Sequence, residues 1–321
     1  MAEDSSWWKD RPDLEAARTE RKLLRSKRRA LHIRAAMMDA IRTFFAKKDF
    51  LEVQTPVRIP TPALEDYIEA IPSGNAWLRT SPEFHMKRML AAGFDRIYQT
   101  GPCFRRDEDG SRHLLEFTML EWYRNGGDWL DVLEDCHDLL AEIGYHCFQT
   151  SEFLFRGQLI DVGCDWERIT VEEAFQKYAD ADLDEVIALG RFEEVLCLRV
   201  EPRLGMGGRP TVLTEYPLAC SGLSAQIPGR PNRVERWEVY VCGLELGNAC
   251  TELADPAEQE RRFRETAALR HREGRDIYPL DQPFLDMIRV GLPKTAGVAI
   301  GLDRLLMLIT GEDDIHDVNA F

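Results

Sequence analysis

The first strong hydrophobic pattern of the chain is a stripe at helical spacing, formed by Met37, Met38, Ile41, Phe44 and Phe45. Apolar positions three or four residues apart share one face of an α-helix. The pattern ends at residues 48–49, and residues 50–55 then alternate toward Pro56. Because proline cannot donate to a sheet ladder, we expect a helix followed by a strand that ends at this proline.

Alternating and periodic segments continue through the middle of the chain. Residues 97–103 and 117–123 predict two strands, and the polar residues 105–113 predict a long loop between them. Apolar positions at helical spacing predict a helix at 129–145 and further helix at 171–200, interrupted at Gly190. A long hairpin followed by helices is therefore expected here.

The C-terminal third predicts shorter elements. We expect a strand at 211–217, a loop at 222–233, a hairpin at 237–249 that turns at Cys242 and Gly243, a charged helix at 256–273, a strand at 298–300 and an apolar helix at 302–310. Gly301 joins the last strand to the last helix, and Gly311 is a suitable residue to end that helix.

Composition narrows the class of protein. The chain has 321 residues, of which 44% are hydrophobic and 30% charged, and this balance excludes a collagen-like, low-complexity or wholly disordered protein. The net charge of −15 provides no general attraction for a nucleic-acid backbone. We expect one large folded domain.

The sequence also suggests where the protein works. The N-terminal residues are acidic and polar, unlike a secretory signal, and the apolar residues 298–310 are interrupted by charges and too short to span a membrane. The eight cysteines are dispersed without metal-binding spacing, as expected of reduced thiols. We therefore expect a cytoplasmic protein with no membrane partner.

A basic segment lies at residues 18–34, which contain eight Lys or Arg residues and one Glu. If this segment is helical, its charges form either a solvated face or a docking patch for an acidic partner. The sequence leaves both interpretations open.

Three glutamates are the only charged residues between Trp237 and Leu253: Glu238, Glu245 and Glu252. With the hairpin turn at 242–243, Tyr240 lies opposite Glu245, and Glu238 shares the face of Tyr240. Two carboxylates on one face repel each other unless a cation is present, and carboxylate oxygens suit Mg²⁺. A magnesium site is one hypothesis, and three solvated glutamates are the other.

Two arginines follow strands at distant points of the chain. Arg105 and Arg106 lie at the end of the strand before the polar loop, and Arg304 lies in the first turn of the last helix, behind Gly297 and Gly301. A guanidinium can hold a phosphate with two hydrogen bonds, and glycines allow a ligand close to the backbone. Each fragment alone is equally typical of a surface ion pair or of packing.

Taken together, these segments resemble the class II aminoacyl-tRNA synthetases, and specifically the lysine branch. The helix from Arg34 with the strand to Pro56 is similar to motif one, residues 104–123 to motif two and residues 297–304 to motif three. The segments 81–88 and 116–123 are similar to the short paralogues of lysyl-tRNA synthetase that modify elongation factor P. The resemblance implies an α+β fold, an antiparallel sheet flanked by helices, and a homodimer.

The resemblance also implies roles for individual residues. It implies catalysis by Arg105 and Arg304, Mg²⁺ binding by Glu238 and Glu245, ATP binding by Arg105, Arg106, Asp107, His113, Phe117, Glu245, Leu246, Gly301 and Arg304, and amino-acid binding by Ser81, Glu83, Glu121, Tyr123, Asn248 and Glu252. Within the last set, Glu121, Tyr123 and Glu252 match the residues that receive the ammonium of a lysine-type substrate.

The implied activity is the ATP-dependent activation of lysine or (R)-β-lysine and its transfer to a lysine of elongation factor P. Residues 30–321 match the catalytic domain, residues 1–29 form an extension, and we expect no anticodon-binding domain and no tRNA partner. A shortened tRNA-charging enzyme and a non-catalytic sensor of amino acid or nucleotide are the alternatives.

Three positions depart from the pattern of that family. Leu114 and Leu115 replace Asn-Pro, Ala249 and Cys250 replace Gly-Phe, and Asp107 replaces a glutamate. The second departure removes an aromatic wall from the expected amino-acid pocket, and the sequence does not tell which amino acid this change admits.

Overall fold

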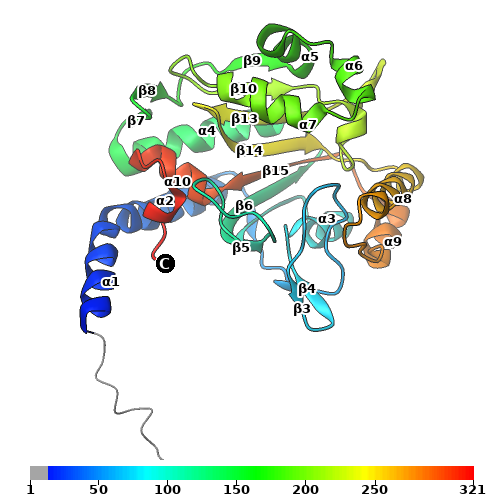
Figure 1. Cartoon of the computed structure of the whole chain (residues 1–321). Coiled ribbons are helices and arrows are strands. Elements are labelled where there is room, and N and C mark those ends of the chain that lie inside the picture. Colours follow the sequence, from blue (N-terminus) through cyan, green and yellow to red (C-terminus); the bar gives the residue numbers. More distant parts are fainter. Residues whose placement is uncertain (1–13) are drawn as a thin grey trace, which may run out of the picture.

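The computed structural model describes residues 14–321, so the first residues of the predicted extension lie outside the described part. Two helices open the described chain, α1 (Leu14–Ser26) and α2 (Arg28–Lys47), with a break at Lys27. Helix α1 buries none of its residues and leads away from the body in Figure 1. The helix expected from the stripe at 37–45 is confirmed in α2, where five of its six buried residues lie in or beside that stripe.

The body is built on an eight-stranded sheet in the order β1-β5-β6-β15-β14-β13-β10-β9 (Figure 1). Its strands are β1 (Leu51–Glu52), β5 (Arg96–Phe104), β6 (Glu116–Asn125), β9 (Glu167–Thr170), β10 (Thr211–Thr214), β13 (Arg236–Val241), β14 (Leu244–Thr251) and β15 (Thr295–Gly301). The six central strands are antiparallel, as expected. The two edge strands, β1 and β9, pair in parallel, which the prediction did not include.

Smaller ribbons surround this sheet. They are β2 (Arg58–Ile59), β4 (Ala76–Leu78) and β3 (Pro72–Ser73) in one sheet, β7 (Glu152–Phe155) with β8 (Gln158–Asp161), and β11 (Gln226–Ile227) with β12 (Arg230–Val234). The prediction of a loop at 222–233 is wrong in part, because β11 and β12 pair within it. Gly229 takes a positive φ of 79° and allows the tight turn between these two strands.

One face of the sheet is covered by α2, α4 (Trp129–Phe148) and α10 (Leu302–Thr310). Apolar side chains of these helices and of the central strands form the largest core cluster. Arg34 of α2 pairs with Asp303 at 2.6 Å and donates to Thr118 Oγ1 of β6 at 2.5 Å. Asp303 also accepts the backbone N–H of Thr118, so one polar cluster joins α2, β6 and α10.

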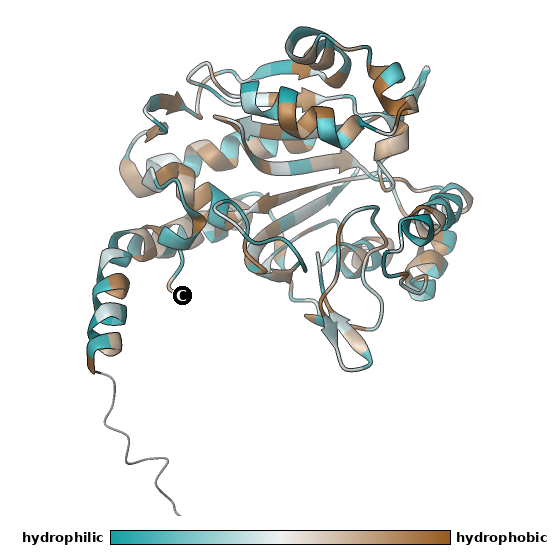
Figure 2. Cartoon of the chain, in the orientation of Figure 1, coloured by the Kyte–Doolittle hydropathy of each residue, from teal (hydrophilic) through white to brown (hydrophobic). Residues whose placement is uncertain are grey.

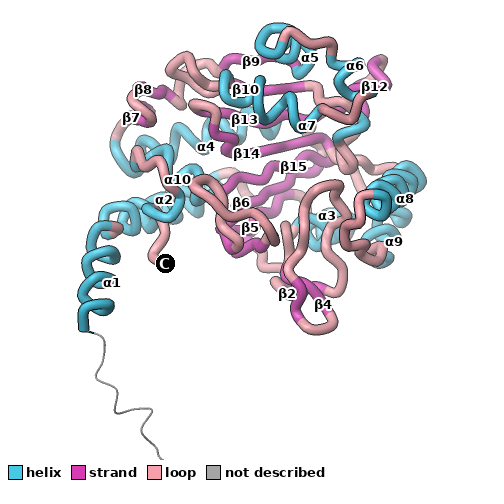
Figure 3. The backbone as a smooth tube through the Cα atoms, viewed as in Figure 1, coloured by secondary structure: helices cyan, strands magenta, loops and turns pink. Residues whose placement is uncertain are grey.

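The other face carries α3 (Glu83–Ala91), α8 (Pro256–Arg272) and α9 (Gln282–Gly291). Helix α8 is largely teal in Figure 2, and Figure 3 shows that long loops lie between this helix pair and the sheet. These loops, together with the strand ends, form the site described below.

The helix expected at 171–200 is broken into short pieces, α5 (Val171–Ala174), α6 (Leu183–Ala188) and α7 (Phe192–Val195), with π-helical turns at Phe175–Ala179 and Leu196–Val200. Asp180 and Gly190 adopt the left-handed conformation, and Asp182 caps α6 by accepting the N–H of Glu185. These local stops explain why the apolar spacing did not produce one helix. Within 14–321, no helix combines the length and the apolarity that crossing a membrane requires.

Candidate functional site

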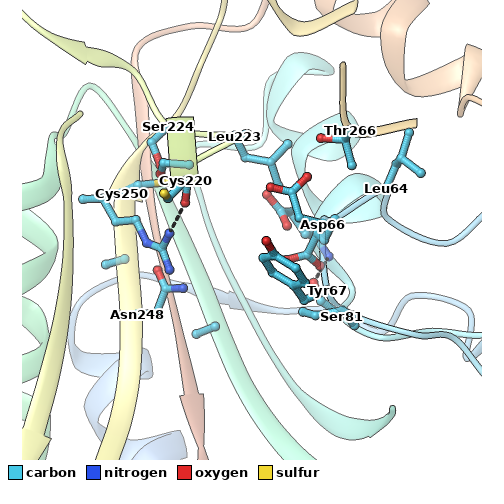
Figure 4. A pocket seen from close by; sticks show the side chains of 18 of the residues that line it. Leu64, Asp66, Tyr67, Ser81, Cys220, Leu223, Ser224, Asn248, Cys250 and Thr266 are labelled. Carbon is cyan, nitrogen blue, oxygen red and sulfur yellow. Dashed lines mark hydrogen bonds between the residues drawn. The ribbon is translucent and has the colours of Figure 1, made fainter. Parts of the chain in front are cut away.

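A cavity of about 400 Å³ opens above β6, β14 and β15, bordered by two loops, 64–69 and 219–224. In Figure 4, Leu64, Asp66 and Tyr67 lie on one side of this cavity, and Asn248 and Cys250 lie on the other. Seven of the residues assigned by resemblance line it: Ser81, Glu83, Arg105, Glu121, Tyr123, Asn248 and Glu252. All six residues expected for the amino acid therefore gather in one place.

Glu121 is a buried carboxylate that lacks a cationic partner among the described residues. Its side chain accepts hydrogen bonds from Tyr123 Oη at 2.6 Å and from Ser81 Oγ at 3.2 Å. Only 2% of the residue is exposed, and burial raises the pKa of Glu121 to about 8. A carboxylate in such a setting is a receptor for an incoming cation or proton.

Glu252 differs, because its cation is supplied by the protein. Lys87 of α3 forms ion pairs with Glu252 and with Glu83, the latter at 2.5 Å, and is itself only 2% exposed. The two carboxylates raise the pKa of Lys87, so the lysine stays charged despite burial. Lys87 is a site residue that was not predicted, although Glu83 and Lys87 stand at the i, i+4 spacing of a helical ion pair.

Gly297 lets the ring of Tyr123 lie against β15. A Cβ atom at this position would come within 2.2 Å of Tyr123 Cε1 and 3.0 Å of Glu252 Oε1. Any larger residue would displace the tyrosine that holds Glu121, so the glycine noted in the sequence has a steric role in the cavity.

Arg105 brings a half-buried cation to the same cavity. Its guanidinium lies 5.2 Å from the ring centroid of Phe117 and 3.6 Å from Glu108. Arg105 Nε is buried without a hydrogen-bond partner in the described structure. Because buried donors are normally satisfied, this orphan donor indicates a position for an anionic ligand.

A second group, Arg304, His113 and Glu245, forms where β14 meets the start of α10. Arg304 Nη2 donates to His113 Nε2 at 2.5 Å, and Arg304 Nη1 pairs with Glu245 at 3.1 Å. Burial and the guanidinium lower the pKa of His113, so this ring stays neutral and accepts from the arginine. Residues almost 200 positions apart in sequence thus meet, as the resemblance implied.

The hairpin of β13 and β14 turns at 242–243 and pairs Tyr240 with Glu245, which confirms the predicted register. The expectation that Glu238 and Glu245 share a face without a cation is wrong, however. Arg236 pairs with Glu238 at 2.6 Å, and Tyr216 and Tyr240 also donate to Glu238 at 2.5 Å. Arg236 lies one residue before the segment 237–253, in which the glutamates are the only charged residues. Strand alternation places its side chain on the face of Glu238.

The two carboxylates suit a divalent cation that takes most of its ligands from water and phosphate. Glu245 uses one oxygen toward Arg304. Burial raises the pKa of Glu238, and the neighbouring Glu245 carboxylate adds to this rise. Within residues 14–321, no group of three or more His, Cys, Asp or Glu side chains has a metal-binding arrangement. Mg²⁺ is commonly held by one or two carboxylates plus phosphates, so this donor set fits it.

The other residues assigned to ATP lie apart from the cavity lining. Arg106 pairs with Glu69 and, at 3.0 Å, with Asp276, and the side chain of Asp107 is 76% exposed. Leu246 is buried in the core cluster, and Gly301 is the N-cap residue of α10.

The residues that depart from the family pattern lie at or near the site. Leu114 packs against the main core, and 46% of Leu115 is exposed, on the loop beside His113. Ala249 and Cys250 line the cavity, so the missing aromatic wall leaves space in the cavity itself.

Comparison with known proteins agrees with this geometry. The family model described as tRNA synthetases class II (D, K and N) matches residues 17–321. An elongation factor P–(R)-β-lysine ligase of Salmonella gallinarum is 37% identical over 309 residues, covering 90% of this chain and 93% of the relative. The corresponding ligase of Histophilus somni is 36% identical over 308 residues, with the same coverage.

Lysine–tRNA ligases are also similar. The enzyme of Chloroflexus aurantiacus is 30% identical over 321 residues, and that of Prochlorococcus marinus is 29% identical over 313 residues. The chain spans only 65% and 61% of the length of these two relatives.

Proposed function

The chain belongs to the class II tRNA synthetase family, and we propose that it activates lysine or (R)-β-lysine with ATP and transfers it to a lysine side chain of elongation factor P. One observation carries this proposal. Among residues 14–321, the same cavity holds a buried carboxylate that forms no ion pair, Glu121, and a half-buried guanidinium whose buried Nε has no acceptor, Arg105. A zwitterionic amino acid with a second ammonium, next to a phosphate, provides partners for both.

The names of the relatives support the choice of acceptor. Two ligases named for elongation factor P and (R)-β-lysine share 36% and 37% identity with this chain. Three lysine–tRNA ligases are less similar, at 29% to 32%. The aromatic wall missing at Ala249 and Cys250 leaves room for an amino acid whose amino group is displaced from the α-carbon.

In the first step, a carboxylate oxygen of the amino acid attacks the α-phosphorus of ATP, the bond to the bridging oxygen breaks, and pyrophosphate leaves. Catalysis of such a step depends on positioning and on charge stabilisation. We assign Arg105 to the α-phosphate, Arg304 to the γ-phosphate, and Phe117 to one face of the adenine. The loop 105–113 would cover the nucleotide, and it contains Arg106, Asp107 and His113.

Glu245 and Glu238 would hold Mg²⁺, which supplies neutralisation of the phosphate charge when bound. In the second step, the neutral ε-amine of the acceptor lysine attacks the carbonyl carbon of the adenylate. An amide forms, AMP leaves with the electron pair of the broken bond, and the amine proton passes to solvent. We also expect a homodimer, as the resemblance implies, which sedimentation equilibrium would test.

A labelling experiment tests the proposal. ATP, Mg²⁺ and labelled lysine or (R)-β-lysine are offered to the protein with elongation factor P and bulk tRNA together. We expect acid-stable label on elongation factor P, lost when its acceptor lysine is replaced by arginine. A comparison of the two amino acids in pyrophosphate exchange then identifies the preferred substrate.

Two other outcomes would contradict the proposal. Label on tRNA alone would indicate a tRNA-charging enzyme like the lysine–tRNA ligases. Label on neither acceptor, with no pyrophosphate exchange, would indicate a sensor that binds its ligands without reaction.

A further inference from the structure

Helix α8 stands behind both loops that border the cavity. It contains three polar side chains that are almost fully buried: Gln259, Arg262 and Arg270, exposed by 1%, 4% and 0%. Buried arginines are uncommon unless their donors are used. The Nη1 atoms of both arginines and the side-chain amide of Gln259 donate to backbone carbonyls of the two loops.

Arg270 holds the 64–69 loop. Its guanidinium donates to the carbonyls of Glu65 at 2.7 Å and Ile68 at 3.0 Å, and to the carboxylate of Glu69 at 2.7 Å. It also lies 4.8 Å from the ring centroid of Tyr278, which itself donates to Glu69 at 2.9 Å. Five residues of this loop line the cavity.

The 64–69 loop also contacts the segment that contains Arg105. The backbone N–H of Arg106 donates to the carbonyl of Glu69 at 2.8 Å, so Glu69 is fixed to the residue next to Arg105. Burial raises the pKa of Glu65 to about 7, and the Arg105 guanidinium opposes this rise, as expected when the two side chains face each other. Arg270 therefore supports the side of the cavity that contains the phosphate-binding arginine.

Arg262 holds the opposite loop. It donates to the carbonyls of Ser221 at 3.1 Å and Ser224 at 2.8 Å, and Gln259 donates to that of Gly222 at 3.2 Å. Ser224 and Glu252 form an isolated antiparallel β-bridge through their backbones. The neighbouring N–H of Leu253 donates to the carbonyl of Leu223 at 3.0 Å. Arg262 therefore supports the side that contains Glu252 and its partner Lys87.

We propose that Arg262 and Arg270 are positioning residues with separate effects, Arg262 on the amino-acid side of the cavity and Arg270 on the nucleotide side. This inference rests on the proposed function, since it assigns the two sides to the two substrates. Neither arginine lines the part of the cavity around Glu121, so both act through the loops that they hold.

The test replaces each arginine by lysine, which keeps the charge but cannot serve several carbonyls at once. In pyrophosphate exchange, Arg262→Lys should raise the KM for the amino acid about tenfold while the KM for ATP changes less than about twofold. Arg270→Lys should do the reverse, with a higher KM for ATP and a lower kcat. Arg264→Lys, an exposed ion-pairing position of the same helix, is the matched control and should leave all three parameters unchanged.

Hydrogen exchange gives a readout that does not depend on activity. Arg270→Lys should speed amide exchange at 64–69 only, and Arg262→Lys at 219–224 only. If Arg270→Lys does not fold, Tyr278→Phe, which removes one donor to Glu69, takes its place with a smaller effect in the same direction. Equal shifts of both KM values in both variants, or no local change in exchange, would overturn the inference.

A failure of the proposed function would look different. The unaltered protein would then show no amino-acid-dependent pyrophosphate exchange. The local effects on hydrogen exchange would in that case still decide whether α8 holds the two loops separately.

Discussion

Glu121 and Glu252 are both buried carboxylates of one cavity, yet among residues 14–321 only Glu252 forms an ion pair, with Lys87. The substrate ammonium is therefore more strongly needed at Glu121. This difference was not predicted, because the resemblance assigns both residues to the substrate and their spacing in sequence does not indicate Lys87 as a partner.

We predict that Glu121→Gln weakens use of the lysine-type substrate more than Glu252→Gln does. The loss for Glu121→Gln should be about 3 to 5 kcal/mol in kcat/KM, the usual effect of breaking a buried ion pair. Pyrophosphate exchange with each variant measures this difference. An equal or larger loss for Glu252→Gln would contradict the role of Glu121 as principal receptor.

Glu121 should also make the KM for the amino acid depend on pH. Burial raises the pKa of Glu121 to about 8, so the empty site holds a proton at neutral pH. A cationic substrate favours the ionised form, and its binding should release this proton. The KM for the amino acid should therefore fall as the pH rises from about 6 to about 8, by up to about tenfold per unit.

The stability of the unliganded protein should change in the opposite sense. A carboxyl whose pKa is raised on folding contributes stability below its ordinary pKa and loses it as the pH rises through about 8. Thermal melting against pH measures this effect, and Glu121→Gln, which cannot ionise, should reduce the slope of both profiles between about pH 5 and about pH 8. Unchanged profiles in that variant would show that another group titrates.

At the scale of elements, the pair of Lys87 and Glu252 connects α3 to β14. Lys87→Met should destabilise the protein by about 3 to 5 kcal/mol, because the buried Glu252 and the half-buried Glu83 lose their cation. The double variant Lys87→Met with Glu252→Gln should recover part of that loss. Urea unfolding of the parent, both single variants and the double variant gives the coupling free energy, and additive effects would argue against a direct pair.

Helices and turns that depend on one strong local sequence pattern were predicted correctly. The stripe in α2, the hairpin turn at 242–243 and Gly311 at the end of α10 each follow from a local rule, and all are found. The segment 171–200 has apolar positions at helical spacing, but Asp180 and Gly190 in left-handed conformations divide it. The site residues came from resemblance, whereas Arg236, Lys87 and the anchors of α8 become visible only when the chain is folded.

At the scale of the molecule, charge is unevenly distributed. The chain has a net charge of −15, yet residues 18–34 are strongly basic and mostly exposed on α1 and the start of α2. Arg29 differs, because it donates to the carbonyl of Thr310 at 3.2 Å. A test of the docking interpretation should leave this residue in place.

Reversing the charge of Arg21 and Arg25 together should slow transfer to elongation factor P several-fold, more at low salt, and leave pyrophosphate exchange unchanged. The reason is that these side chains would contact only the acceptor. Arg191 and Arg199, exposed on another part of the chain, provide a control with the same change of net charge. Unaltered transfer kinetics would favour the solvated-face interpretation.

The order of the sheet has a consequence for synthesis of the chain on the ribosome. Strand β15, residues 295–301, lies between β6 and β14, so a segment made after both of its neighbours occupies the centre of the sheet. Until it emerges, the nascent protein has two half-sheets with open edges, and open edges favour pairing with other chains. The nascent chain should therefore depend on chaperones until β15 has left the ribosome.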